Sequence, residues 1–174
     1  MAFKFKSVFD GAQSALSADP ARALSTVETR SHQRDGLNSA VTVRQFTVDV
    51  DEPRALGGLD KAPTPLEYIL VALSSCQEIT YRLYADALGI PLNGVSVRLT
   101  GEIDLRGFFN VDPNVRAGYQ KIEAEVILDS PASEQELERL KDLVDRHCPV
   151  LDMLANPTPV HLSLRKAPVT AAAQ

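Results

Sequence analysis

Residues 64–89 read TPLEYILVALSSCQEITYRLYADALG and predict the element around which this fold is built. Thr64 and Glu67 have the spacing of a capping box, and Pro65 suits the first position of a helix. Apolar residues then recur at helical spacing, and Gly89 suits the left-handed position that ends a helix. We therefore predict a helix from Pro65 to the residue before Gly89, roughly 36 Å long at 1.5 Å per residue. So long and apolar a helix must be packed on more than one side, at the centre of the fold or in a subunit interface.

Five segments outside this helix predict β-strands, because apolar and β-branched residues alternate in them with polar ones. The turn signal Arg34-Asp35-Gly36 joins the first two into a hairpin, and the third and fourth are expected to pair antiparallel. The predicted strands are 23–32, 40–50, 94–103, 119–128 and 160–165.

Two further helices are predicted, with a short turn or helix over 150–155. Residues 7–17 can form a short helix that Gly11 interrupts, and Ser133 with Glu136 forms a second capping box. The helix that follows this box carries a stripe of apolar residues and ends at Cys148, just before a proline. The order of strands, helix, strands, helix and strand indicates the α+β class.

The chain has 174 residues, enough for one domain with a real core, and no repeat marks a second domain. We treat 1–22 as an N-terminal extension, 104–118 as a long loop of the kind that often serves function, and 167–174 as a loose tail. The net charge of −5 and the lack of a basic stripe argue against nucleic-acid binding. The chain lacks an apolar run of about 18 residues and an apolar secretory signal, so we expect a cytoplasmic protein.

Cys76 and Cys148 are the only cysteines. In the cytoplasm a lasting disulfide is disfavoured, so such a pair is more often transient, catalytic or metal-binding. Cys76 lies inside the apolar helix, beyond the first turn in which the helix dipole acts, so a reactive Cys76 needs a cation from elsewhere. Cys148 ends the second helix, where the negative end of the dipole disfavours a thiolate. Cys76 is therefore the better nucleophile, and Cys148 the better resolving partner.

Other interpretations of the cysteines stay open at this point. A small thiol within an apolar helix stripe is commonly an inert core residue. A metal site built from both cysteines, His147 and either His161 or His32 lacks any CxxC or HxxxH spacing. The candidate cations for a Cys76 thiolate are Arg30, Arg34, Arg44 and Arg54.

Several segments resemble the OsmC/Ohr superfamily of thiol peroxidases. They include DEPRALGGLDKAPTPLEYILVALSSC (51–76), GEIDLRGFF (101–109) and HCPV (147–150), and the resemblance runs from about Arg34 to about Arg165. It implies an OsmC-like α+β fold, with antiparallel sheets packed around a long central helix that carries the first cysteine. It also implies an intertwined homodimer with active sites at the subunit interface.

The resemblance implies a thiol-dependent reduction of organic hydroperoxides, as part of an oxidative stress response. The residue that matches Cys76 attacks the O–O bond, releases an alcohol and becomes a sulfenic acid. The residue that matches Cys148 condenses with it to a disulfide, and an external dithiol, such as a lipoyl protein, restores both thiols. Arg34, in its Arg-Asp-Gly turn, matches the arginine that stabilises the thiolate. No metal, haem or flavin is expected.

One position departs from the family pattern. Members that confer organic hydroperoxide resistance carry a glutamate, which holds the arginine, where this chain has Leu66; the glutamate here is Glu67. Residue 67 lies roughly 180° around the helix from Cys76, so capping explains Glu67 better than catalysis does. The departure leaves two alternatives: a protein that binds a small hydrophobic ligand at the dimer interface, or a redox sensor with little turnover. The expected substrate-pocket residues are Phe108, Phe109 and Tyr81, with dimer contacts and core packing as their alternative roles.

Overall fold

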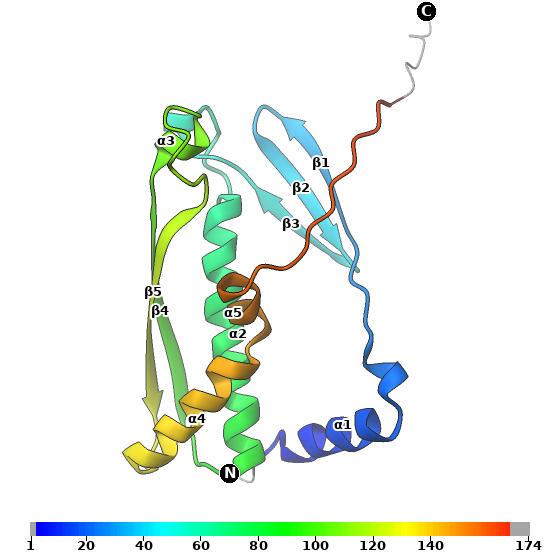
Figure 1. Ribbon diagram of the computed structural model, residues 1–174, viewed down its shortest axis with the longest axis vertical. Helices are drawn as coiled ribbons and strands as arrows, with labels where there is room; N and C mark the ends of the chain where they lie inside the picture. The colour runs from blue at the N-terminus through cyan, green and yellow to red at the C-terminus, as the bar shows by residue number, and fades with distance from the viewer. Residues whose placement is uncertain (1–2, 168–174) are drawn as a thin grey trace, which may run out of the picture.

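The computed structural model describes residues 3–167 and confirms the α+β class (Figure 1). The helix α2 runs between two antiparallel sheets, β1-β2-β3 on one side and β4-β5 on the other. In chain order the elements are α1 (Lys6–Ala18), η1 (Pro20–Ala23), β1 (Thr29–Asp35), β2 (Asn38–Val43), β3 (Phe46–Val50), η2 (Arg54–Leu56), α2 (Pro65–Leu88), β4 (Gly94–Ile103), α3 (Leu105–Phe108), β5 (Tyr119–Asp129), α4 (Glu134–His147) and α5 (Pro149–Ala155).

The two capping boxes predicted from the sequence are both present. The Thr64 hydroxyl accepts the N–H of Glu67 at 3.2 Å, and the N–H of Thr64 donates to the Glu67 carboxylate at 2.7 Å. Ser133 and Glu136 make the same exchange at the start of α4, at 3.4 and 2.9 Å. Gly89, at φ +71°, ends α2 as predicted. The capping role of Glu67 is therefore confirmed.

The hydrophobic core lies between the second half of α2, α4 and the β4–β5 sheet. Tyr81 and Ala85 of α2 meet Leu140 and Val144 of α4, and none of the four is more than 1% exposed. Burial of a side chain such as Leu140 stabilises a fold by roughly 1.5–3 kcal/mol. This packing fixes α4 against α2, and α4 in turn carries Cys148 at its end.

The β1–β3 sheet stands apart from this core, and every residue of β1 is exposed. The β1–β2 hairpin is confirmed, but the single strand predicted over 40–50 is wrong. Arg44 and Gln45 make a turn there between β2 and β3, with Arg44 at φ +52°. The turn contains no glycine, proline or asparagine, so the sequence carries no signal for it. A hydrogen bond of 2.8 Å from the Tyr68 hydroxyl to the Asp49 carbonyl joins β3 to α2.

The first and last predicted strands also differ from the structure. The strand predicted over 23–32 begins only at Thr29: Ala23 ends a 3-10 turn, and residues 24–28 have no regular structure. Residues 160–165 form no strand, and Leu162 and Leu164 are 93% and 101% exposed. A strand needs a neighbour for its backbone hydrogen bonds, and within residues 3–167 this segment has none. The short N-terminal helix is confirmed as α1 and continues through Gly11.

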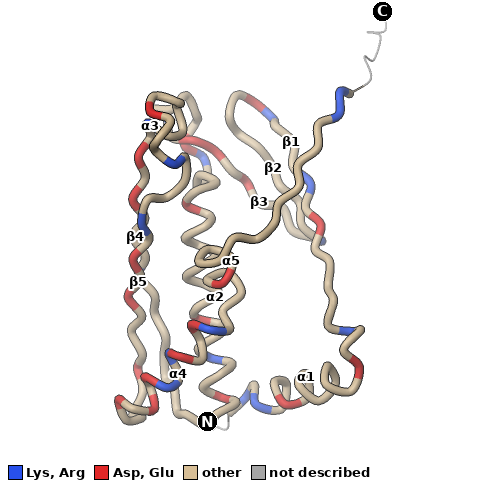
Figure 2. The backbone as a smooth tube through the Cα atoms, viewed as in Figure 1, with Lys and Arg blue, Asp and Glu red and all other residues tan. Residues whose placement is uncertain are grey.

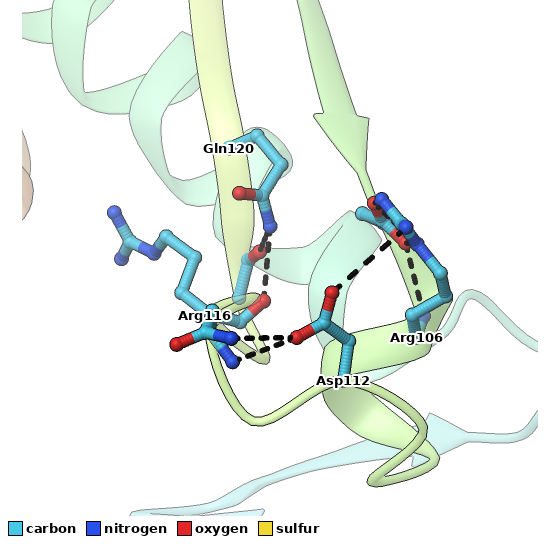
Figure 3. A network of polar contacts seen from close by, with 7 residues as sticks. Arg106, Asp112, Arg116 and Gln120 are labelled. Atoms are coloured by element: carbon cyan, nitrogen blue, oxygen red, sulfur yellow. Dashed lines mark hydrogen bonds and ion pairs between the residues drawn. The ribbon is translucent and has the colours of Figure 1, made fainter.

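The long connection between β4 and β5 is ordered by polar contacts (Figure 3). The Asp104 carboxylate caps α3 and accepts from the Arg106 guanidinium, which also faces Asp112 at 4.0 Å. The side-chain amide of Gln120 donates to the carbonyl of Arg116 at 2.9 Å. These contacts hold the connection in one shape at the end of the β4–β5 hairpin.

The isolated chain exposes an unusually large surface, 13405 Å². A compact monomer of 18.9 kDa exposes about 8,300 Å², so the excess is about 5,000 Å². Figure 2 shows acidic and basic residues interspersed along the described chain, with no continuous basic stripe. None of the helices among residues 3–167 has the length and apolar character needed to cross a membrane.

Candidate active site

The structure brings the two cysteines together, although 72 positions separate them in sequence. The Cys148 thiol donates to the Cys76 sulfur, and the two Sγ atoms lie 3.3 Å apart. Both thiols are free. A disulfide bond is about 2.0 Å long, so the sulfurs need to approach by only about 1.3 Å to form one. The pair is a dithiol that can close to a disulfide with little movement.

Cys148 occupies a junction between two helices. Its N–H donates to the Val144 carbonyl at 2.8 Å and ends α4, while Pro149 suits the first position of α5. The N–H groups of Val150 and Leu151, in the first turn of α5, face the Cys148 sulfur. Cys148 therefore lies at the negative end of the α4 dipole, as predicted, and also at the start of α5, whose first N–H groups partly offset the rise that burial causes in the pKa of its thiol.

The two thiols differ in exposure and in chemistry. Cys148 is fully buried, whereas Cys76 is partly exposed. Burial raises the pKa of the Cys148 thiol and the Cys76 sulfur raises it further; the N–H groups of Leu151 and Val150 oppose this rise without cancelling it. Cys148 therefore stays a protonated hydrogen-bond donor near neutral pH. Cys76 is the sulfur that a dissolved reagent can reach.

Arg34, the predicted thiolate stabiliser, lies on β1. Its guanidinium pairs with the Asp49 carboxylate of β3 at 2.8 Å, and both side chains are about half exposed. Arg30, another candidate, pairs with Glu28. Among the described residues, no hydrogen bond or ion pair joins a cation to Cys76. The role of Arg34 towards Cys76 stays a prediction.

The three predicted pocket residues lie in two different places. Phe108 and Phe109 are exposed on the connection between β4 and β5, with their rings in T-shaped contact at 5.0 Å. Tyr81 is buried in the core and also lines a groove between α2, β5 and α4. A single chain therefore does not bring the three side chains into one pocket.

Two grooves are lined by residues close in sequence to the two cysteines, among them Leu73 and Leu151. The larger, of about 860 Å³, lies between α2, β5, α4 and α5; the smaller, of about 460 Å³, extends towards the start of α2. Two small residues, Ala124 of β5 and Ala155 of α5, line both grooves. The residues common to both are Leu73, Ala124, Leu151 and Ala155.

The alternative metal site finds no support in the part of the chain that the structure describes. Residues 3–167 contain no cluster of three or more His, Cys, Asp or Glu side chains arranged to hold a metal ion. The Nδ1 atom of His147 donates to the Leu143 carbonyl at 2.8 Å, and its ring packs against that of Tyr84 at 5.3 Å. The histidine beside Cys148 is thus engaged with its own helix and with α2.

A family model described as OsmC-like protein matches residues 58–163, a span that contains α2, α4 and both cysteines. This chain belongs to the OsmC-like family. The family assignment expected from the resemblance is confirmed. No curated protein sequence matches the chain.

Solved OsmC-like structures share the fold. An OsmC-like protein from Mycoplasma pneumoniae is 23% identical, with a TM-score of 0.66 over 76% of this chain and 89% of its own. An organic hydroperoxide resistance protein OsmC from Legionella pneumophila is 22% identical, with a TM-score of 0.59 over 75% and 90%. An organic hydroperoxide resistance protein from Elizabethkingia anophelis is 19% identical, with a TM-score of 0.54 over 77% and 91%. At these identities the likeness establishes the fold.

Proposed function

We propose that this OsmC-like protein is a cysteine-based peroxidase that reduces organic hydroperoxides to alcohols. The observation that carries the proposal is the 3.3 Å contact between a partly exposed Cys76 and a buried, protonated Cys148. Membership of a family with hydroperoxide-resistance members supports the same substrate class.

The reaction is proposed in three steps. The Cys76 thiolate attacks one oxygen of the O–O bond, which leaves a Cys76 sulfenic acid and releases the alcohol once a proton reaches it. Cys148 then attacks the sulfenic sulfur, a disulfide forms and water leaves. An external dithiol, for example that of a lipoyl protein, is oxidised to its own disulfide and returns both thiols. This route draws on no metal, haem or flavin.

The proposed site includes Arg34 and a second copy of the chain. The β1–β3 sheet that carries Arg34 lies outside the core, and the chain exposes about 5,000 Å² more than a compact monomer of its size. We infer a homodimer in which Arg34 exchanges the Asp49 carboxylate for the Cys76 thiolate. Replacement of Arg34 by methionine should slow Cys76 oxidation by at least tenfold without loss of the fold.

The test of the proposed function is a thiol count. Addition of cumene hydroperoxide to the reduced protein should consume both thiols and release one cumyl alcohol per disulfide formed. Cys76→Ser should lose this reaction completely, because the remaining thiol is buried. Survival of both thiols in an excess of peroxide would contradict the proposal.

Cys148→Ser separates the resolving role from the peroxidatic one. Without a second thiol the Cys76 sulfenic acid has no intramolecular partner, so further peroxide should convert it to the sulfinic acid. Mass spectrometry of the peroxide-treated variant measures this as a gain of two oxygen atoms on Cys76. An unmodified Cys76 after the same treatment would argue against a resolving role for Cys148.

One observation favours a second function, redox sensing or ligand binding with little turnover. Glu67 is engaged in the capping box, and Leu66 occupies the position of the family's arginine-holding glutamate. A sensor should oxidise rapidly at Cys76 and recover very slowly with every dithiol tried. A binding protein should retain its ligand in Cys76→Ser, whereas a peroxidase loses all turnover in that variant.

A further inference from the structure

The larger groove is lined by two largely buried residues whose polar side chains have no hydrogen-bond partner within residues 3–167. Gln77 and Tyr81 lie one turn apart on α2, line the groove and are 4% and 1% exposed. Neither side chain takes part in a hydrogen bond within residues 3–167. No fully enclosed side-chain polar atom there lacks a partner, so the polar atoms of Gln77 and Tyr81 keep some accessible surface, and both residues line the groove. These accessible polar atoms are therefore available to make hydrogen bonds to a molecule in the groove.

The inner walls of the groove are apolar, and the groove has the size of a ligand site. Its volume of about 860 Å³ lies within the range of roughly 300–1,000 Å³ that is typical of small-molecule pockets. Apolar walls with a few convergent polar groups are the usual composition of such pockets. The apolar walls are formed by Leu73, Val126, Leu128, Leu137 and Leu151.

Charges at the rim restrict the ligand. The rim carries four acidic and two basic side chains, a net charge of −2, and one of the basic ones, Lys141, pairs with Asp145 at 2.5 Å. An anionic ligand is therefore disfavoured. Burial, helped by the negative charge of Asp145, raises the pKa of Tyr81 to about 12, so its hydroxyl remains a donor. The side chains of the rim are Glu134, Glu138, Asp145, Asp152, Lys141 and Arg146.

We propose that this groove binds a neutral or cationic small molecule with an apolar body and a hydrogen-bond acceptor that Tyr81 and Gln77 reach. The site is separate from the proposed peroxide site, since neither sulfur lines the groove. It is nevertheless a neighbour of the dithiol: Gln77 follows Cys76, and the N–H of Leu151, a wall residue, faces the Cys148 sulfur.

The test is a titration of the full-length protein, in its native assembly, with two fluorescent dyes. Nile red is uncharged and carries a carbonyl acceptor, whereas anilinonaphthalene sulfonate is anionic. We expect saturable binding of Nile red, at least tenfold tighter than that of the sulfonate. Tyr81→Phe and Gln77→Leu should each weaken Nile red binding about five- to tenfold, the effect of one lost hydrogen bond. An affinity for Nile red that is unchanged from the unsubstituted protein in both variants would overturn the proposal.

Variants that fill the groove and variants elsewhere locate the bound dye. Ala155→Trp on α5, or Ala124→Trp on β5 if the first fails to fold, should abolish saturable binding. The double variant Phe108→Ser, Phe109→Ser removes the exposed aromatic pair and should leave binding unchanged, as should Cys76→Ser, which ends the proposed peroxidase reaction. Loss of binding in the phenylalanine variant would place the dye at the β4–β5 connection and overturn the proposal. Absence of binding to the native assembly, as when a second copy fills the groove, would overturn it too.

Discussion

Asp51 is a fully buried carboxylate at the start of the loop that leads into α2. It accepts the N–H groups of Glu52 at 2.8 Å, Leu59 at 3.3 Å and Lys61 at 3.1 Å. Burial alone would raise the pKa of Asp51, but these three N–H donors and the charge of Lys61 lower it overall. The fold therefore favours the ionised form, and this stabilisation is present above the unfolded pKa, near 4, and lost as the pH falls below it.

Asp51→Asn should lower the thermal unfolding midpoint by about 5 °C at pH 7, because the amide turns an N–H group towards backbone donors. The difference from the unchanged protein should shrink as the pH falls below 4 towards the lowered folded pKa of Asp51, where the carboxylate itself becomes protonated. Melting curves followed by circular dichroism at both pH values measure this. Asp19→Asn, at an exposed position, is the matched control. Equal midpoints for the two variants would show that the loop does not depend on the carboxylate.

For Tyr81 we predict the opposite pH dependence of stability, a loss at high pH. Its folded pKa is raised from 10.0 to about 12, so the fold favours the protonated phenol, and stability is lost as the pH rises above 10. Tyr81→Phe should remove the most alkaline ionisation from the tyrosinate absorbance titration and move alkaline unfolding to higher pH. A titration that keeps this ionisation in the variant would assign it to another tyrosine, such as Tyr84 or Tyr119, whose pKa burial also raises.

At the scale of elements, substitutions at the start of α2 distinguish a capping role of Glu67 from a catalytic one. The capping box needs a side chain that accepts the N–H of Thr64, and glutamine serves this purpose as glutamate does. Glu67→Gln should therefore keep peroxide turnover and change the free energy of unfolding by less than about 0.5 kcal/mol. Thr64→Ala should cost about 1 kcal/mol. Both values come from urea denaturation, and a loss of turnover in Glu67→Gln at unchanged stability would assign Glu67 to catalysis.

Elements with local start and stop signals were predictable from the sequence, and those without them were not. Helix α2 carries both its caps, so its two ends could be predicted to the residue, and the capping box of α4 predicted where that helix begins. The turn at Arg44 has no residue that favours a positive φ, so two strands were predicted as one. The need for glycine at position 58 was likewise not predictable from the sequence. A Cβ atom there would lie 1.8 Å from the Glu52 carbonyl oxygen, a contact between residues six positions apart that the Gly57-Gly58 pair alone does not indicate.

The candidate site was predictable only in part, because its parts come from distant segments. The roles of Cys76 and Cys148 followed from their helices and from the family resemblance, and the structure then placed their sulfurs in contact. The groove beside them depends on how β5 faces α4 and α5, a relation that no local pattern encodes. Tyr81 was expected in a pocket, but Gln77 gave no signal in the sequence.

At the scale of the whole molecule, the isolated chain leaves too much surface uncovered. Permanent dimers bury roughly 2,000–5,000 Å² in total, and the excess of about 5,000 Å² per chain is ample for such an interface. Apolar side chains on α2 are among the exposed ones, as are those of residues 160–165. These residues include Ile69, Val71, Ile79, Val160, Leu162 and Leu164.

Residues 160–165 give the sharpest test of this assembly, because they alternate like a half-buried strand and have no neighbour among residues 3–167. If a second copy supplies that neighbour, the protein should sediment as a dimer of twice 18.9 kDa. Leu162→Ser with Leu164→Ser should raise the dimer dissociation constant at least about 100-fold, since each buried leucine contributes roughly 1.5–3 kcal/mol. His161→Ala with Arg165→Ala changes the other face and should leave the dimer intact. If both double variants dissociate to the same extent, or if both remain dimeric, this segment does not pack against a second copy through its leucine face.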